Sequence, residues 1–260
     1  MLVEFDSVEE FAKACKQAVK EPSYRRADTW TAHVSFSQAI EKSLVGDESY
    51  VDGANKLIDQ LDVDMPTTKA FKRVHSPYGG SVNMGDWLAA SPTPMRRRIR
   101  TSSDIGPVNI YVSTTSSAGV DAETMKKRGY AILALLLKLQ TVRPIQLYLL
   151  TELHGARDGW HYQKIRVESQ PLNISVAAFA LCNVGWARHL TYDYAREIDG
   201  FNGCWPKGYD SPGYVEARRE RLGLADNDLL IKKAHVQDEL VKRPLEWLTK
   251  QLEKYANIND

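Results

Sequence analysis

The sequence predicts an α/β protein whose core is a mainly parallel sheet with flanking helices. Two observations carry this prediction. From residue 107 onward, short runs of branched and aromatic residues alternate with longer apolar stretches of helical periodicity. Strands separated by helices need crossover connections, and such connections join parallel strands.

The composition is that of a folded domain. Of the 260 residues, 43% are hydrophobic and 26% are charged, which excludes the disordered class. The 34 Lys and Arg residues nearly balance the 33 Asp and Glu residues. Binding to nucleic acid would therefore depend on a local basic patch, because the chain as a whole is not basic.

The first 60 residues are expected to be helical. Ser7 and Glu10 form a capping-box pattern, in which a hydroxyl and a carboxylate satisfy backbone donors at the start of a helix. Apolar residues at helical spacing follow, and similar spacing predicts two more helices near residues 35–44 and 50–61. Residues 1–104 are thus predicted to form a helical N-terminal region that also contains a basic loop segment.

The basic loop segment is the strongest shift in composition along the chain. Pro and Gly punctuate residues 62–107, which predicts loops with one short helix near residues 84–90. Only one acid, Asp86, lies between residues 69 and 100. The basic residues of that interval are Lys69, Lys72, Arg73, Arg96, Arg97, Arg98 and Arg100.

Residues 105–260 are predicted to form the α/β core, in one compact unit with the N-terminal region. Branched and aromatic runs predict strands at residues 108–112, 145–150, 162–167 and 229–234. Helical spacing predicts helices at residues 121–140, 175–194, 214–222 and 243–255. The first of these helices is apolar on every face at its centre, so it should be buried on most sides.

A hydroxyl-rich turn follows the first strand of this core. The order strand, turn, apolar helix, strand over residues 108–150 resembles the opening unit of a von Willebrand factor A-like domain. Such domains carry an Asp-x-Ser-x-Ser motif there, whose side chains hold a divalent cation. Thr115 and Ser117 match the two hydroxyl positions, whereas Ser113 replaces the Asp. A hard cation needs anionic oxygen ligands, so the resemblance implies the fold with a degenerate metal site.

Shorter matches extend the resemblance to an uncharacterised family of phage proteins. They are the segments at residues 36–40, 79–83, 87–89 and 169–173, and the Arg188-His189-Leu190 sequence in a later helix. This resemblance implies a bacteriophage origin and a location in the cytoplasm of the host cell. It implies no activity.

Two candidate sites follow, each with its alternatives. Ser113, Thr115 and Ser117 form either a turn with capping hydroxyls, a contact for a ligand or partner, or a Mg²⁺ site; no cofactor is expected otherwise. Arg73, Arg96, Arg97, Arg98 and Arg100, with Trp87, form either a basic stretch paired with the acidic N-terminal region, a nucleic-acid contact, or a contact for an acidic protein.

Signals for catalysis are weak, and no enzyme is predicted. His154 and His161 are not at a helical ligand spacing, and Cys204 has no neighbouring base to lower its pKa. The sequence also lacks the glycine-rich phosphate loop and the nucleophile elbow.

The predicted function is that of a non-enzymatic protein-interaction adaptor, which engages a host or phage protein. The alternative is a protein that binds single-stranded DNA or RNA through residues 69–100 in phage replication or transcription. No membrane partner is expected, because no stretch reaches about 18 uncharged apolar residues.

Overall fold

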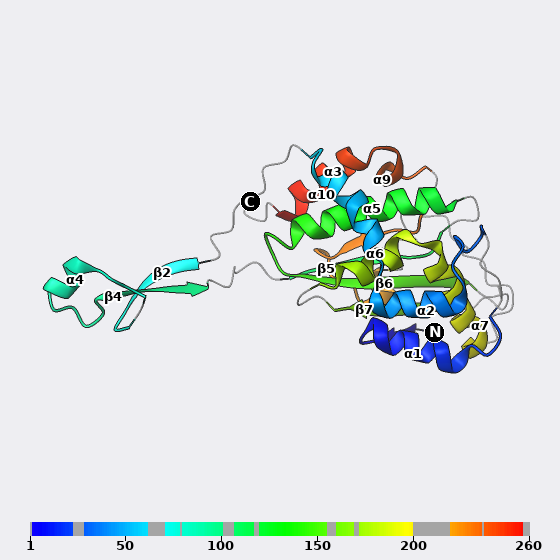
Figure 1. Cartoon of the computed structure of the whole chain (residues 1–260), viewed down its shortest axis with the longest axis horizontal. Coiled ribbons are helices and arrows are strands. Elements are labelled where there is room, and N and C mark those ends of the chain that lie inside the picture. Colours follow the sequence, from blue (N-terminus) through cyan, green and yellow to red (C-terminus); the bar gives the residue numbers. More distant parts are fainter. Residues whose placement is uncertain are drawn as a thin grey trace.

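The computed structural model describes residues 2–22, 29–61, 71–78, 80–100, 107–116, 120–154, 160–168, 172–199, 219–235 and 237–256. These residues form two sheets (Figure 1). A five-stranded sheet with its helices makes up what we call the α/β body. A three-stranded antiparallel sheet projects away from that body.

The five-stranded sheet has the order β1-β7-β6-β5-β8. Its strands are β1 (Leu2–Phe5), β5 (Val108–Ser113), β6 (Ile145–His154), β7 (Trp160–Val167) and β8 (Leu229–Ile231). Strand β5 lies parallel to both β6 and β8, β1 lies parallel to β7, and only the β6–β7 pair is antiparallel. The prediction of an α/β fold with a mainly parallel sheet is therefore confirmed.

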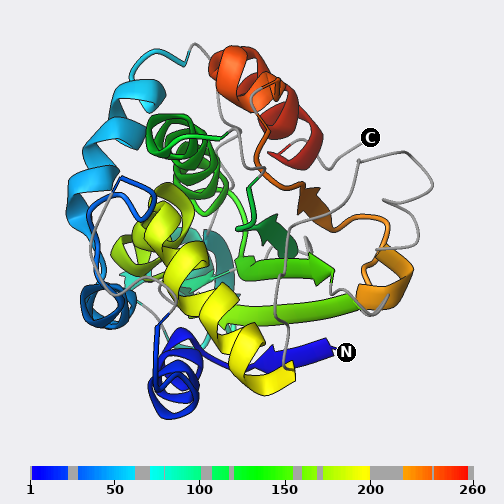
Figure 2. The same cartoon turned by 90° about the vertical axis from the view of Figure 1, so that its right-hand side faces the viewer.

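Helices α5 (Ala122–Leu139) and α6 (Ile174–Cys182) pack on one face of this sheet (Figure 2). The other helices of the body, with their bounds, are α1 (Val8–Ala18), α2 (Phe36–Val45), η1 (Glu48–Tyr50), α3 (Val51–Ile58), η2 (Trp186–Thr191), α7 (Tyr192–Asp199), α9 (Glu239–Lys242) and α10 (Pro244–Ala256). Of the predicted helix at residues 214–222, only the last part lies within the described residues, and that part is helical.

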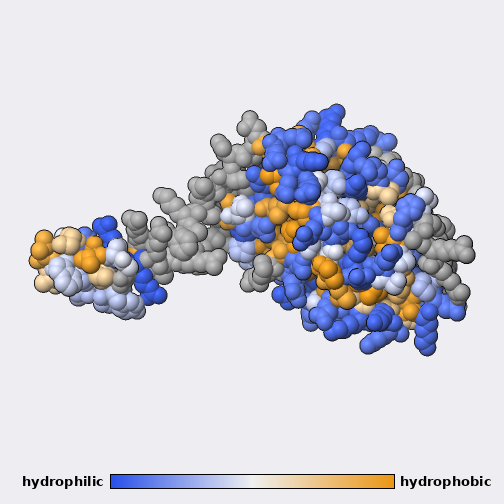
Figure 3. All heavy atoms as spheres, in the orientation of Figure 1, coloured by the Kyte–Doolittle hydropathy of each residue, from blue (hydrophilic) through white to orange (hydrophobic). Residues whose placement is uncertain are grey.

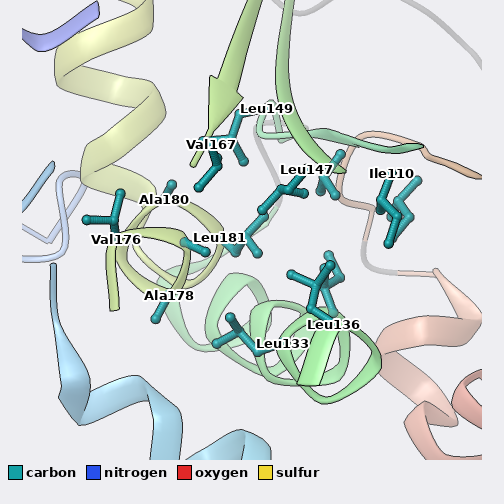
Figure 4. Packing of buried hydrophobic residues seen from close by; sticks show 14 of the residues in the cluster. Ile110, Leu133, Leu136, Leu147, Leu149, Val167, Val176, Ala178, Ala180 and Leu181 are labelled. Atoms are coloured by element: carbon teal, nitrogen blue, oxygen red, sulfur yellow. The ribbon is translucent and has the colours of Figure 1, made fainter. Parts of the chain in front are cut away.

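The core lies between the sheet and the central turns of α5, where residues 131–136 are fully buried. Leu133 and Leu136 point toward the strands and α6, which contributes Ala178 and Leu181 (Figure 4). The two helices approach so closely that a Cβ added at Gly129 would lie 2.3 Å from the Cys182 Sγ atom. The prediction of a helix buried on most sides is confirmed.

The N-terminal strand β1 was missed by the sequence prediction, which made the whole start helical. Its four residues extend the sheet beyond β7, with Phe5 paired with Ile165. The helix predicted after Ser7 is present, and the Ser7 hydroxyl accepts a hydrogen bond from the Glu10 backbone N–H at 3.0 Å. A four-residue strand is too short to show a clear alternation, so its partner strand determines it.

The predicted helix at residues 175–194 is interrupted. Its first part, α6, ends at Cys182, and the next residue, Asn183, has an extended backbone. The π-helical turn η2 then leads into α7. The Asn183 side chain accepts a hydrogen bond from the Gly185 N–H at 2.7 Å and donates one to the Tyr50 hydroxyl at 2.9 Å. These bonds favour the break, because an Asn side chain competes with the helical hydrogen bonds of the backbone.

The basic segment is not a set of loops, and that part of the prediction is wrong. It forms β2 (Phe71–Ser76), β3 (Ser81–Val82) and β4 (Met95–Arg100), in the order β2-β4-β3, with α4 (Met84–Leu88) between β3 and β4. We call these elements together the small sheet. The short helix predicted here is confirmed as α4. The division of the chain at residues 104 and 105 stays a prediction.

Candidate functional site

The hydroxyl-rich turn lies inside the α/β body. Ser113 and Thr115 are each 1% exposed, and their hydroxyl oxygens are 2.8 Å apart in a hydrogen bond. The Thr114 hydroxyl donates to the Leu150 carbonyl oxygen at 3.1 Å. These hydroxyls bond within the fold, and the contact with a ligand or partner predicted at Ser113, Thr115 and Ser117 stays a prediction. The burial of the first two gives it no support, and Ser117 lies outside the described residues.

The turn continues the sheet beyond β5. The Ala234 backbone N–H donates to the Thr115 carbonyl oxygen at 3.0 Å, which joins the turn to the segment after β8. Helix α5 is capped by Asp121, whose carboxylate accepts a hydrogen bond from the Thr124 N–H at 2.7 Å. The capping role considered for the turn hydroxyls is thus performed by Asp121.

Arg128 places a positive charge at this end of β5. Its side chain is 1% exposed, and its Nη2 atom donates to the carbonyl oxygens of Ser113 at 3.1 Å and Lys232 at 2.5 Å. Burial lowers the pKa of Arg128 to about 10, and the charge of Asp238 opposes that shift. The guanidinium is therefore still protonated at neutral pH, and it would repel a Mg²⁺ ion bound beside Ser113.

The small sheet sets its arginines in a regular ladder. Strand pairing places Arg96 opposite His75, Arg98 opposite Arg73 and Arg100 opposite Phe71. Paired positions share a face of an antiparallel sheet, and alternate positions along a strand share a face as well. One face of the small sheet therefore carries four of the five candidate arginines, namely Arg73, Arg96, Arg98 and Arg100.

Exposed aromatic side chains also belong to the small sheet, and one of them contacts Arg97. The Arg97 guanidinium carbon is 5.4 Å from the centre of the Tyr78 ring, and Tyr78 is 65% exposed. Trp87 on α4 is 58% exposed. The Oδ2 atom of Asp86, the one acid of the segment, lies 2.6 Å from the His75 Nδ1 atom.

The predicted pairing of the basic stretch with the acidic N-terminal region does not occur at Arg96 and Arg97. Both residues are exposed, and neither forms an ion pair with any described residue. The side chains of Arg73, Arg98 and Arg100 lie outside what the structure describes. For Arg96 and Arg97, the two remaining alternatives are therefore a contact with nucleic acid and a contact with an acidic protein.

Apolar side chains are also exposed on the small sheet. Met84 and Leu88 of α4 and Val82 of β3 join Tyr78 and Trp87, and Leu88 is 80% exposed. Figure 3 shows hydrophobic surface at the far end of the projection. Among the side chains described between residues 71 and 100, only Ser76 is buried. The described part of the small sheet thus has no hydrophobic core of its own.

The remaining candidates have structural roles where they are described. His161 is fully buried, with its Nε2 atom 3.0 Å from the Gln163 amide nitrogen. Burial raises the pKa of the Cys15 and Cys182 thiols, which disfavours their nucleophilic thiolate form. Cys204 and the side chain of His154 lie outside the described residues. Within the described part of the chain, no group of three or more His, Cys, Asp or Glu residues could hold a metal ion.

Sequence reasoning missed Arg128 and the exposed apolar residues of α4. Arg128 could have been found, because a cationic residue within an apolar stretch of a buried helix needs a buried partner. Met84 and Leu88 gave no such signal, since apolar residues in a short helix are expected to be buried.

Comparison with known proteins concerns the chain as a whole. No curated protein and no solved structure matches it. No helix among the described residues is long and apolar enough to cross a membrane. A family model described as "Domain of unknown function (DUF7192)" matches residues 1–254, a range that includes both the α/β body and the small sheet. The chain therefore belongs to the DUF7192 family.

Proposed function

We propose that the chain is a binding protein whose small sheet contacts single-stranded nucleic acid. The observation that carries the proposal is that the arginine-rich strand β4 and the exposed side chains of Tyr78 and Trp87 belong to one small sheet, which projects from the α/β body (Figure 1). In this proposal the α/β body is the scaffold that presents the small sheet.

The charge of the small sheet favours a polyanionic partner. Residues 71–100 contain six Lys and Arg residues and one acid, a net charge of +5 by subtraction with His neutral. The acid, Asp86, already pairs with His75. Arg binds phosphate oxygens through two parallel donors, so exposed residues such as Arg96 and Arg97 suit a phosphate backbone.

The exposed aromatic rings favour single strands over duplex. Every base has a flat π-face, and stacking on a Trp or Tyr ring contributes about 1–3 kcal/mol per base when the bases are unstacked from a partner strand. Trp87 and Tyr78 are both more than half exposed, so their rings are accessible to such stacking.

The test is the binding of fluorescently labelled oligo-dT and oligo-U, each of about 20 nucleotides, measured by anisotropy. The variant R96E/R97E/R98E should weaken binding by roughly tenfold or more, and the affinity of the wild-type protein should fall steeply with salt. The matched control K16E/K20E/K127E reverses three exposed charges of the α/β body and should bind as the wild type does. Equal affinities for all three proteins would refute the proposal.

A second candidate, the protein-interaction adaptor, is favoured by the exposed apolar side chains of α4. Contact with phosphates and bases does not need exposed Met84 and Leu88, whereas exposed apolar patches commonly bind proteins. Affinity purification with and without nuclease separates the two candidates. Capture of one specific protein that survives nuclease and high salt, and is lost in M84S/L88S, would favour the adaptor.

We further infer that the α/β body is a degenerate von Willebrand A-like domain of a phage-encoded protein that acts in the host cytoplasm. The unit β5, hydroxyl-rich turn, α5, β6 supports the fold part of this inference. Ser113 in the Asp position, with the Arg128 guanidinium beside it, supports the loss of a metal site. The genomic setting of related genes tests the origin: a position outside phage and prophage regions would contradict it.

A further inference from the structure

The imidazole ring of His75 on β2 is held in place by Asp86 of α4. The Asp86 Oδ2 atom lies 2.6 Å from the His75 Nδ1 atom, and it also accepts a hydrogen bond from the Asn83 amide. An ionised carboxylate can only accept hydrogen bonds, so the Nδ1 atom carries the hydrogen and donates it to Asp86. The contact fixes the ring, and the Nε2 atom is the nitrogen left for other partners.

The Nε2 atom of His75 is available to a ligand. The His75 side chain is 55% exposed, and its Nε2 atom has no hydrogen-bond partner among the residues that the structure describes. When Nδ1 is the donor of a neutral imidazole, Nε2 has a free lone pair and acts as a hydrogen-bond acceptor. A ligand that satisfies this atom must therefore carry a hydrogen-bond donor.

Strand pairing places His75 in a row with Arg96 and Ser81. Strand β4 lies between β2 and β3, so Arg96 has His75 opposite it on one side and Ser81 on the other. Residues paired in this way share a face of the sheet, with Cβ atoms about 4.5–5.5 Å apart. All three residues are exposed. The face thus has a cation between two side chains that can accept a hydrogen bond.

This row suits the backbone of RNA better than that of DNA. Phosphate oxygens only accept hydrogen bonds, so a phosphate of either nucleic acid can bind the Arg96 guanidinium. The 2′-hydroxyl of the adjoining ribose both donates and accepts. The sugar–phosphate backbone of DNA has acceptors alone, and an acceptor such as the His75 Nε2 atom would lose its water there without gaining a partner.

We propose that the small sheet binds RNA in preference to DNA, because the His75 Nε2 atom accepts a hydrogen bond from a ribose 2′-hydroxyl whose adjoining phosphate lies on Arg96. This inference rests on the proposed contact with single-stranded nucleic acid, and it names RNA as the ligand. Ser81, on the other side of Arg96, offers an acceptor to a neighbouring ribose.

The test compares the affinities of the full chain for oligo-U and oligo-dU of equal length, which differ only in the 2′-hydroxyl. Anisotropy is measured in slightly alkaline buffer, where imidazole is ordinarily neutral. The wild type should bind oligo-U more tightly by roughly three- to tenfold, the range that one hydrogen bond supplies. Oligo-U with 2′-O-methyl groups should bind as weakly as oligo-dU, because it keeps the sugar conformation of RNA but has no hydroxyl hydrogen to donate.

The variant His75→Ala should bind both oligonucleotides with the affinity that the wild type has for oligo-dU, because it removes the acceptor and leaves Arg96 in place. The matched control His33→Ala removes an exposed histidine of the α/β body and should keep the preference for oligo-U. If His75→Ala disturbs the small sheet, the comparison of the three oligonucleotides on the wild type still decides, because it needs no variant.

The outcomes separate this inference from the function on which it rests. Equal affinities of the wild type for oligo-U and oligo-dU would overturn the preference for RNA and leave the proposed function intact. Absence of binding to either oligonucleotide would refute the proposed function as well. A preference that persists in His75→Ala, or 2′-O-methyl oligo-U that binds as tightly as oligo-U, would overturn the role of the His75 Nε2 atom.

Discussion

The fit of single residues decides how the helices of the α/β body meet. At Gly129 the α5 backbone lies so close to α6 that an added Cβ would meet the Cys182 Sγ atom and, at 2.7 Å, the Leu181 carbonyl oxygen. Glycine is required there because any larger residue would separate the two helices. The requirement is steric and does not come from the backbone conformation, because Gly129 lies inside the helix α5.

Gly129→Ala should therefore lower the free energy of unfolding. Overpacking of a tight contact typically costs about 1–3 kcal/mol. The loss at Gly129 should lie in the upper part of this range, because the added Cβ would be only 2.3 Å from the Cys182 Sγ atom. Chemical denaturation monitored by circular dichroism measures the change. Gly80→Ala is the control, because no atom lies within 4 Å of the position of its Cβ, and a loss of similar size there would contradict the explanation.

A second prediction at the scale of single residues concerns Asp121. Its hydrogen bonds with Thr124 hold the pKa of the Asp121 carboxyl below its ordinary value of 3.8. A lowered pKa in the folded state means that the stabilisation is present above the ordinary value and is lost as the pH falls through the lowered one. Asp121→Ala should cost about 0.5–2 kcal/mol near neutral pH, and that difference should shrink in acid.

Unfolding free energies at several pH values between neutral and acid test this prediction. Asp121→Asn is the control, because an amide oxygen also caps a helix but carries no charge to titrate. A difference between wild type and Asp121→Ala that stays constant across the acid range would show that the carboxylate is not the stabilising group.

At the scale of elements, the sequence predicted best the structures that local pattern alone determines. Helix α5 and strand β5 were predicted to within one residue of their observed bounds, because each has a clear apolar pattern. Strand β7 was predicted to begin two residues late, and β6 was predicted to end four residues early, at residue 150. Strand β1 was missed, and β2 and β4 were read as loops. Their existence depends on pairing with other strands, and four of the six residues of β4 are arginines, which do not mark a strand in the sequence.

The candidate site was predictable to a similar degree. The arginines and Trp87 were identified from charge and residue type, since these do not depend on the fold. Their arrangement on one ladder was not, because the strand register sets which residues share a face. The burial of Ser113 and Thr115 was not predictable either, since it follows from the parallel bridge between Ser116 and Ala234.

Strand β1 also joins the N-terminal helices to the sheet through Phe5. The Phe5 ring makes edge contacts with the rings of Phe11 at 5.1 Å and Tyr194 at 5.6 Å. Phe5→Ala should lower the free energy of unfolding by about 3–5 kcal/mol, because it leaves a cavity between β1, α1 and α7.

Thermal or chemical unfolding measures this loss. Leu2→Ala in the same strand is the control, since Leu2 is 41% exposed and its truncation should cost less than about 1 kcal/mol. Equal losses for the two variants would mean that β1 contributes through its backbone pairing and not through the aromatic contacts of Phe5.

At the scale of the whole molecule, the α/β body and the small sheet differ in what stabilises them. The body has a continuous apolar core, and the described part of the small sheet has none. Among the residues whose side chains are described, none of the hydrogen bonds or ion pairs of the small sheet reaches the body. We therefore expect the two parts to differ in local stability.

Replacing residues 71–100 by a short Gly-Ser linker should leave the melting temperature of the α/β body within about 4 °C of the wild-type value, because no core contact is removed. Binding of labelled oligo-dT or oligo-U should be lost in the same variant. In the intact chain, hydrogen exchange should be much faster in β2 and β4 than in β5 and β6. A large fall in melting temperature would show that the small sheet stabilises the body.

The position of Arg128 has a consequence for how the protein responds to its surroundings. A cation that is covalently part of α5 cannot be removed by a chelator, and its presence does not vary with the concentration of free magnesium in the cell. The end of β5 is therefore held in one charge state wherever the chain is folded. The Arg128 guanidinium links the end of β5 to the segment after β8 through its hydrogen bonds to the Ser113 and Lys232 carbonyl oxygens, and this link needs no exchangeable ion.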